Sequence, residues 1–504
     1  MVVSTGVQFI NTSQSQKPVR LKSKSVPQIH PFFGDQILRE SGQLFLRLNP
    51  NGYIRPLAIN NSIGPEEILE YPYRVLSDYV KAEIISPERI EDLERRARPL
   101  KGSRILNLNS SASIGGGVAD LLRNIFVPFL RGLGIDARWG VMGGEKEFFD
   151  VTKLILHNGL QNKPIKKFTQ NRKNLYINTP LQNLQRLNLS QADIVICHDP
   201  QALPMIEAKI KGKNGAKYIW RCHVDTSTPN LQIWNFLRNF IEKYDAAVFS
   251  HPNFIKSDIL TKLPIALIPP AIDPLSIKNM YRDESQAKCK IYLKPLFEKY
   301  GIDHSKPFAL QLSRFDPSKG WDHIVDVARK LKDVQFVLAG PELKSVSDDT
   351  EQEKIFNDLK RKTKNDANIF LVELPQEDNQ RIVGALFSSS DVVLQLSTKE
   401  GFGLTKTEAD WINGVTIGSF AGGLSLQGGR YDPSNTDAIA GRVFKLLNDN
   451  AERMRLREES RTRVMKHFLL DRYLIEWLTL FNDVLEGRLK NGIVDYNGWT
   501  KMTA

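Results

Sequence analysis

Phe308-Ala309-Leu310-Gln311-Leu312, followed directly by Ser313-Arg314-Phe315-Asp316-Pro317-Ser318-Lys319-Gly320, is the stretch that decides the fold. An apolar run that ends in a Pro- and Gly-containing polar segment predicts a buried strand leading into a loop. Similar apolar runs recur on both sides of it, separated by segments of helical length. This alternation predicts parallel sheets covered by helices on both faces, whose ligands bind beyond the carboxyl ends of the strands.

The alternation falls into two series, which predict two doubly wound Rossmann-like α/β domains facing a cleft. The predicted strands lie at residues 105–108, 136–141, 194–197, 218–220, 246–249, 266–268, 308–312, 336–339, 369–372 and 392–396. We expect the first domain at residues 76–275 and the second at residues 276–469. Residues 1–75 are expected to form an arm and a small β-containing extension.

Composition narrows the class of protein. The 504 residues are 41% hydrophobic and 25% charged, which is typical of a globular protein and excludes a disordered, fibrous or disulfide-rich chain. Three cysteines are too few for a disulfide framework and suit a reducing interior, so we expect a cytoplasmic protein. No apolar stretch reaches the roughly 18 residues of a membrane span.

Composition does not decide which kind of partner the excess of positive charge serves. Lys and Arg number 69 against 57 Asp and Glu, a formal net charge of +12 that would suit nucleic acid, a membrane surface or a polyanionic substrate. Four of the cations, Lys17, Arg20, Lys22 and Lys24, lie in the first 34 residues, which contain no acid. We interpret this segment as a flexible or docking arm, since transit peptides are typically Arg-rich and amphipathic.

Three loops offer groups that bind phosphate or sugar. Arg314 and Lys319 flank a proline turn at a strand end, where two fixed cations could clamp a diphosphate or form a solvated basic loop. Ser113-Ile114-Gly115-Gly116-Gly117 opens a helix, and it suits either phosphate binding or a tight turn. Glu400-Gly401-Phe402-Gly403-Leu404-Thr405-Lys406-Thr407-Glu408 places two carboxylates around a helix start, which favours nucleotide-sugar binding over hydrolysis.

His and Asp follow two presumed neighbouring strands of the first domain, in His198-Asp199-Pro200-Gln201 and Arg221-Cys222-His223-Val224-Asp225. A zinc site lacks the expected ligand spacing, and a serine hydrolase lacks the G-x-S-x-G elbow. No D-x-D pair occurs, so a carboxylate-held metal is not predicted. A nicotinamide oxidoreductase is excluded by the missing G-x-G-x-x-G fingerprint.

Together these motifs resemble the retaining GT-B glycosyltransferases of family 4. The loop 313–321 and the E-x7-E motif of Glu400 and Glu408 carry the general likeness. Segments 115–119, 134–139, 148–153, 198–201 and 220–225 are similar to the glycosyl-transferring trehalose synthases and the retaining trehalose phosphorylases. The likeness covers residues 76–487.

The resemblance implies a nucleotide-diphosphate glucose donor in the second domain, a sugar acceptor in the first, and no required cofactor. It implies a catalytic group of His223, Arg314, Lys319 and Glu400. The implied donor contacts are Gly116, Gly117, Arg314, Lys319, Gly401, Phe402, Gly403, Leu404, Thr405 and Glu408. The candidate acceptor ligands are Asp199, Gln201, Arg221 and Asp225. The resemblance is compatible with a C-terminal helix at residues 470–487 that packs back on the first domain. It is also compatible with a homodimer.

The implied reaction is a front-face displacement with retention, most simply from the donor to glucose to give trehalose. A trehalose phosphorylase, or a decayed GT-B scaffold that binds nucleic acid or another polyanion, stays open, although we expect no nucleic-acid partner. The sequence departs from the family pattern at Ile412-Asn413-Gly414-Val415-Thr416, where a G-K-P turn is usual. It also departs between Gly423 and Asp437, where the chain is about five residues short and Gly428-Gly429-Arg430-Tyr431-Asp432 replaces the usual hairpin. These departures put substrate specificity in question.

Overall fold

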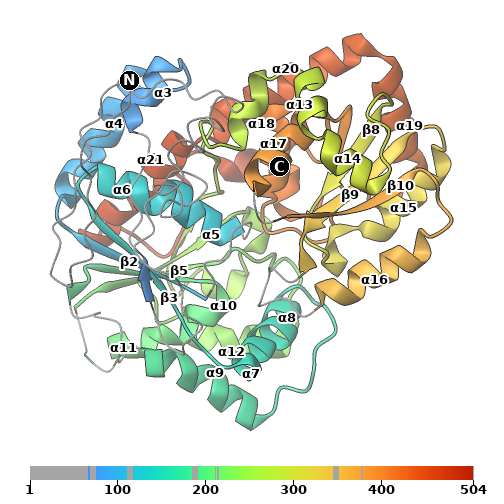
Figure 1. Ribbon diagram of the computed structural model, residues 1–504. Helices are drawn as coiled ribbons and strands as arrows, with labels where there is room; N and C mark the ends of the chain where they lie inside the picture. Colours follow the sequence, from blue (N-terminus) through green and yellow to red (C-terminus); the bar gives the residue numbers. More distant parts are fainter. Residues whose placement is uncertain are drawn as a thin grey trace, which may run out of the picture.

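The computed structural model describes residues 66–68, 75–110, 117–183, 191–210, 212, 215–343, 351–375 and 378–502. The basic arm and most of the predicted N-terminal extension lie outside these residues, as does Gly116. Two α/β halves lie side by side, the first drawn mainly in blue to green and the second in yellow to orange (Figure 1). Each half is built on one sheet, as the alternation of apolar runs predicts.

The first sheet has the strand order β1-β3-β2-β4-β5-β6-β7-β13. All its pairs are parallel except β1 with β3, which is antiparallel. Asp136 to Val141 form β3 with the bounds predicted from the sequence. The strands are β1 (Glu66–Ile68), β2 (Arg104–Asn109), β3 (Asp136–Val141), β4 (Ile194–His198), β5 (Lys217–Arg221), β6 (Ala246–Phe249), β7 (Pro264–Leu267) and β13 (Gly492–Val494).

The second sheet is wholly parallel, in the order β10-β9-β8-β11-β12. Its central strand β8 is the apolar run Phe308–Leu312, four of whose five residues are buried. The strands are β8 (Phe308–Leu312), β9 (Gln335–Pro341), β10 (Ile369–Leu374), β11 (Val392–Gln395) and β12 (Thr416–Gly418).

The helices cover the sheets with one apolar face each. In α15, for example, Ile324, Val325 and Ala328 are buried while Asp322 and Arg329 reach solvent. The α-helices are α3 (Leu76–Lys81), α4 (Pro87–Ala97), α5 (Gly117–Leu121), α6 (Val127–Gly132), α7 (Lys146–Val151), α8 (Asn158–Leu160), α9 (Gln170–Asn183), α10 (Asp199–Ala202), α11 (Glu207–Ile210), α12 (Leu231–Ile241), α13 (Gln286–Tyr292), α14 (Lys294–Tyr300), α15 (Trp321–Lys330), α16 (Gln352–Lys362), α17 (Asn379–Ser389), α18 (Leu404–Ile412), α19 (Thr436–Asn448), α20 (Asn450–His467) and α21 (Leu470–Leu485).

The C-terminal segment returns to the first half. Helix α21 contacts α4 (Figure 1), and Trp477 packs edge-on against Phe126 with ring centroids 5.0 Å apart. Strand β13 then extends the first sheet beside β7. Arg472 of α21 stabilises this return to the first half, because its guanidinium donates to the carbonyls of Pro269 and Pro270. The same guanidinium pairs with Glu476 at 2.7 Å. The two halves are therefore joined by packed structure as well as by the chain.

Candidate functional site

The carboxyl ends of β4 and β5 bring two of the sequence motifs together. The strands are hydrogen-bonded neighbours, with His198 opposite Arg221. Asp199 follows β4 in the left-handed region at φ 56°, and its Oδ1 accepts a 2.7 Å hydrogen bond from the backbone N–H of His223. Burial raises the pKa of Asp199 to about 7, even though this hydrogen bond and Arg221 act in the opposite direction. Asp199 therefore holds the backbone that presents His223.

The other three candidate acceptor ligands lie in different settings. Arg221 is fully buried and donates from Nη2 to Ser250 Oγ at 3.0 Å, while its Nε and Nη1 have no partner among the described residues. Asp225 is also buried, and its Oδ1 accepts from both the N–H and the hydroxyl of Ser227. The Oε1 atom of Gln201 is buried without a hydrogen bond. In this conformation Arg221 and Asp225 support the strand ends from beneath the surface.

The loop after β8 is built by Asp316 and Gly320. Asp316 Oδ1 accepts from the N–H of Ser318 at 2.8 Å and so caps a single 3-10 turn, Pro317–Lys319. Gly320 has φ 69°, and a Cβ there would lie 1.9 Å from the carbonyl oxygen of Leu396, so only glycine fits. The turn aims Lys319 at the second loop, where its Nζ lies 2.6 Å from Glu400 Oε2. The structure thus joins the two motifs that sequence analysis assigned to one site.

Two lysines of the first half reach into the same loop. Lys153 and Lys163 pair with the two carboxylate oxygens of Asp316 at 3.3 and 3.2 Å. Burial alone would raise the pKa of Asp316, but these lysines and Arg314 hold it well below its usual range. Sequence analysis quoted Lys153 within a family segment and gave Lys163 no role. Both lysines are far from Asp316 in the sequence, so no local sequence pattern connects them with it.

The E-x7-E segment lies against the first half of the molecule. Gly403, with φ 89°, precedes α18 and lets the chain turn into the helix. A Cβ at Gly401 would lie 1.8 Å from the carbonyl oxygen of His223, so the two backbones are in direct contact. Nearby, Lys399 Nζ donates to Thr228 Oγ1 at 2.8 Å. The loop that starts at Glu400 and the segment after β5 therefore meet at His223.

The other residues of this loop differ in their surroundings. Leu404 approaches the first half, since a Cβ at Gly117 would lie 3.6 Å from Leu404 Cδ1. Phe402 is buried and packs against Phe468, and Thr405 is partly exposed on α18. Gln427, in the short stretch that departs from the family pattern, donates from Nε2 to the Phe402 carbonyl oxygen at 2.7 Å and accepts from Thr407 Oγ1 at 2.8 Å. The shortened segment therefore still supports the loop.

Glu408 has a lysine partner that sequence analysis missed. Lys278 Nζ lies 2.6 Å from Glu408 Oε1, and both side chains are largely buried. Burial alone would lower the pKa of Lys278, but the carboxylate outweighs it and raises that pKa, so the ammonium keeps its proton. No motif surrounds Lys278, and 130 residues separate the pair. Only the fold brings the two groups together.

A second buried ion pair lies within α18. Lys406 Nζ contacts Asp410 Oδ2 at 2.7 Å and Thr416 Oγ1 at 3.0 Å. The turn that replaces the family's G-K-P is ordered as well, because the Asn413 amide donates to the carbonyls of Phe387 and Ser390. Helix α18 is thus fixed along its length.

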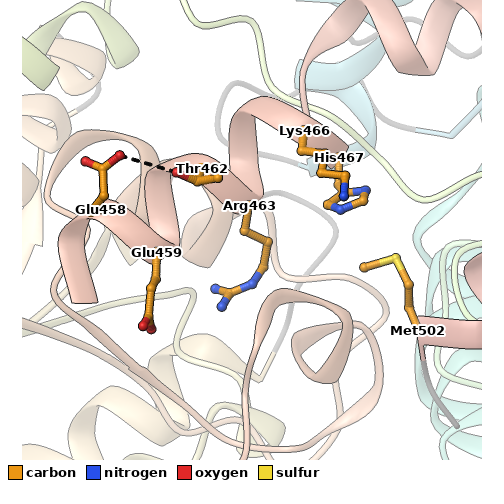
Figure 2. Close-up of a pocket in the computed structure, with 7 residues that line it drawn as sticks. All are labelled: Glu458, Glu459, Thr462, Arg463, Lys466, His467 and Met502. Atoms are coloured by element: carbon orange, nitrogen blue, oxygen red, sulfur yellow. Dashed lines mark hydrogen bonds between the residues drawn. The ribbon is translucent and has the colours of Figure 1, made fainter. Parts of the chain in front are cut away.

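A separate hollow of about 420 Å³ lies on α20 and holds none of the predicted site residues (Figure 2). It is lined by Glu458, Glu459, Thr462, Arg463, Lys466, His467 and Met502. Among the described residues, no group of three or more His, Cys, Asp and Glu side chains is arranged to hold a metal ion. No described helix has the length and apolarity needed to cross a membrane.

Comparison with known proteins adds to this geometry. Residues 107–256 match the family model "Trehalose synthase, N-terminal domain", and residues 294–463 match "Glycosyl transferases group 1". The chain is 38% identical to the trehalose synthase of Thermococcus litoralis over 81% of its own length and 96% of that protein. It is 28% identical to the trehalose phosphorylase of Pleurotus pulmonarius over 70% of its length and 54% of that protein.

Solved structures agree on the fold. The UDP-forming α,α-trehalose-phosphate synthase of Burkholderia vietnamiensis superposes with a TM-score of 0.59 at 16% identity, covering 76% of this chain and 97% of the other. At that identity the match confirms the predicted GT-B architecture of two Rossmann-like domains.

Proposed function

The chain belongs to the trehalose synthase family of glycosyltransferases, and from this premise we propose that it transfers glucose, with retention, from a nucleotide-diphosphate glucose to glucose, giving trehalose. The 2.6 Å contact between Lys319 and Glu400 supports the proposal most directly. It unites a phosphate-binding cation with a carboxylate that can accept from sugar hydroxyls, at the wall formed by Gly401 and His223.

Each role follows from chemistry and position. Arg314 and Lys319 bind the diphosphate, because fixed cations stabilise the charge that develops on a leaving phosphate. Glu408 accepts from the ribose hydroxyls with the oxygen that Lys278 leaves available. Glu400 and the backbone of Gly401 to Leu404 bind the glucose, and Gly116 and Gly117 approach the donor from the opposite wall. Asp199, Gln201, Arg221 and Asp225 serve the acceptor directly or, as their burial favours, by supporting its site.

Catalysis rests on stabilising the leaving group and positioning the acceptor. The acceptor hydroxyl attacks from the side that the diphosphate leaves, and a departing phosphate oxygen takes its proton. The C1–O bond to phosphate breaks as the new C1–O bond forms on the same face, which retains configuration. Losing one clamp cation costs about 3 kcal/mol, or about 10²-fold in rate.

The likeness to a fungal trehalose phosphorylase supports a second candidate, in which inorganic phosphate replaces the nucleotide. Arg314 and Lys319 suit either anion. We also propose domain boundaries near residues 275 and 469, with the donor in the second domain and the acceptor in the first. A cytoplasmic location agrees with the three buried free cysteines.

One assay separates these candidates. Purified protein is incubated with a panel of nucleotide-diphosphate glucoses and acceptors that include glucose and phosphate, and products are scored by mass and anomeric configuration. Glucose-dependent nucleotide release with an α,α-linked product supports the synthase. Trehalose cleavage that requires phosphate and no nucleotide would instead support the phosphorylase.

Clamp variants make the test specific to the site. Arg314→Ala and Lys319→Ala should each lower turnover at least tenfold, whereas Lys332→Ala, an exposed lysine, should not change it. Unchanged turnover in Arg314→Ala or Lys319→Ala would remove that residue from the clamp. No turnover with any substrate pair, together with tight salt-sensitive binding of nucleic acid, would refute the transferase proposal.

A further inference from the structure

Three polar side chains form a continuous hydrogen-bonded line from inside the first sheet to the segment after β5. They come from three elements: Asn107 on β2, His198 at the end of β4, and His223 after β5. Asn107 Oδ1 lies 3.1 Å from His198 Nε2, and His198 Nδ1 lies 3.0 Å from His223 Nε2. The two imidazole planes are only 15° apart. Asn107 is fully buried and His198 is 3% exposed.

Asn107, at the inner end of the line, determines which atoms donate and which accept along it. Asn107 Nδ2 donates to the backbone carbonyl of Arg138 at 3.2 Å. A carbonyl oxygen can only accept, so the amide nitrogen of Asn107 must face it and the amide oxygen must face His198. His198 Nε2 therefore carries a proton, which it donates to Asn107.

Both imidazole rings are neutral, so the position of the proton on His198 determines its position on His223. Burial lowers the pKa of His198 to about 3 and that of His223 well below its usual value, and the positive charge of Arg221 acts in the same sense on both. A neutral imidazole has one N–H and one unprotonated nitrogen. Because His198 has its proton on Nε2, its Nδ1 is an acceptor, and His223 must donate to it from Nε2.

The outer end of the line is an acceptor on His223. With its proton on Nε2, His223 presents an unprotonated Nδ1, which has no partner among the described residues. The residue is only partly buried, and its carbonyl oxygen lies against Gly401. Such a nitrogen can accept a hydrogen bond from a hydroxyl and cannot donate one.

We propose that Asn107 and His198 are positioning residues that hold His223 in the Nε2-protonated tautomer, so that its Nδ1 accepts a hydrogen bond from a hydroxyl of the substrate sugar. The proposal rests on the proposed function for its ligand, a neutral sugar. The tautomer itself is a property of the protein alone. A fixed acceptor beside the donor loop orients the hydroxyl before reaction and selects sugars that have one at that position.

Nitrogen NMR of histidine tests the tautomer without turnover. The chain has eight histidines, so ¹⁵N-histidine labelling and long-range ¹H–¹⁵N correlation give few signals, and His198→Gln and His223→Asn assign the pair. We expect His223 to show a protonated Nε2 and an unprotonated Nδ1 at neutral pH. A protonated Nδ1 on His223, or a positively charged ring, would overturn the proposal.

Matched substitutions at His198 test the positioning role. His198→Leu removes the acceptor for His223, and it should give mixed tautomers at His223 and about tenfold lower kcat. His198→Gln keeps an oxygen to accept and a nitrogen to donate, so it should preserve the tautomer and keep kcat within about threefold of the parent. Asn107→Leu removes the acceptor for His198, so it should have the same effects on the His223 tautomer and on kcat as His198→Leu. His304→Gln, on an exposed histidine, controls for the labelling and should change neither.

The outcomes separate the two proposals. If no glucosyl donor is turned over but His223 shows the expected tautomer, the proposed function fails and the positioning network stands. If turnover occurs and His198→Leu matches His198→Gln in both tautomer and kcat, the network fails and the function stands. Thermal denaturation of each variant identifies loss of kcat that comes from unfolding.

Discussion

Gly401→Ala should separate the two walls of the site without unfolding either half. The added Cβ would lie 1.8 Å from the carbonyl oxygen of His223, whereas a carbon and a carbonyl oxygen rest at about 3.3 Å or more. The clash is between two backbones, so no side-chain rotation relieves it and the walls must move apart by about 1.5 Å. A misplacement of about 1 Å costs about 10²-fold in rate, so kcat/KM should fall about 100-fold.

The assay compares kcat/KM for glucosyl transfer with the melting temperature of the same sample. Because the two backbones belong to different halves, a small separation of the halves absorbs the clash, and the melting temperature should change little. Gly441→Ala is the matched control: Gly441 lies on α19 with no atom within 4 Å of the added Cβ, and alanine there should keep activity and stabilise the helix by about 0.5–1 kcal/mol. Gly401→Ala with kcat/KM within threefold of the parent would refute the closed contact.

Three buried groups give further predictions. Because Lys153, Lys163 and Arg314 depress the pKa of Asp316, its ion pairs stabilise the protein at neutral pH and are lost as pH falls through the folded-state pKa. Asp316→Asn should therefore lower the free energy of unfolding by about 3 kcal/mol at pH 7, and a deficit that persists undiminished below about pH 4 would contradict the assignment. Asp199 has the opposite sign: burial raises its pKa to about 7, so its ionisation costs stability as pH rises from about 4 to 7. Asp199→Asn, measured by urea unfolding, should gain stability relative to the parent across that range, and a constant difference would show that Asp199 does not titrate there. Lys406→Met leaves Asp410 buried without its partner and should cost about 3 kcal/mol, while Lys406→Met with Asp410→Met should recover most of it. A double variant no more stable than the single one would mean that the pair is not coupled.

Local sequence pattern was enough to predict the two sheets. Strand β3 has the predicted bounds, and the apolar run before Ser313 forms the central strand β8 of the second sheet. Each strand of a parallel sheet is buried on both faces, so its apolar run is visible without knowledge of its neighbours. Short strands at the edges gave no such signal: β13 has three residues and includes a glycine.

The site was only partly predictable, for a different reason. Glu400, Glu408, Arg314 and Lys319 lie in short motifs whose spacing is readable, but the lysines that pair with Glu408 and Asp316 lie outside these motifs. Lys278 reaches Glu408, and Lys163 reaches Asp316, across more than 100 residues. The line from Asn107 through His198 to His223 needs the order of three strands, which sequence analysis presumed only for the last two.

The arrangement of charge around Glu400, Glu408 and Asp316 bears on which anion the protein binds. Four lysines there each contact a carboxylate: Lys319 with Glu400, Lys278 with Glu408, and Lys153 and Lys163 with Asp316. A surface that tracks a nucleic-acid backbone needs a row of cations that solvent and phosphate can reach. Largely buried pairs do not supply such a row, because their charges are mostly neutralised and their ammonium groups are held by nearby acids. They instead suit a small ligand that presents phosphate and hydroxyl groups together, since Lys319 can turn toward phosphate while Glu400 accepts from the sugar. The pairing of these lysines with carboxylates therefore says more about the kind of ligand than the net charge of +12 does.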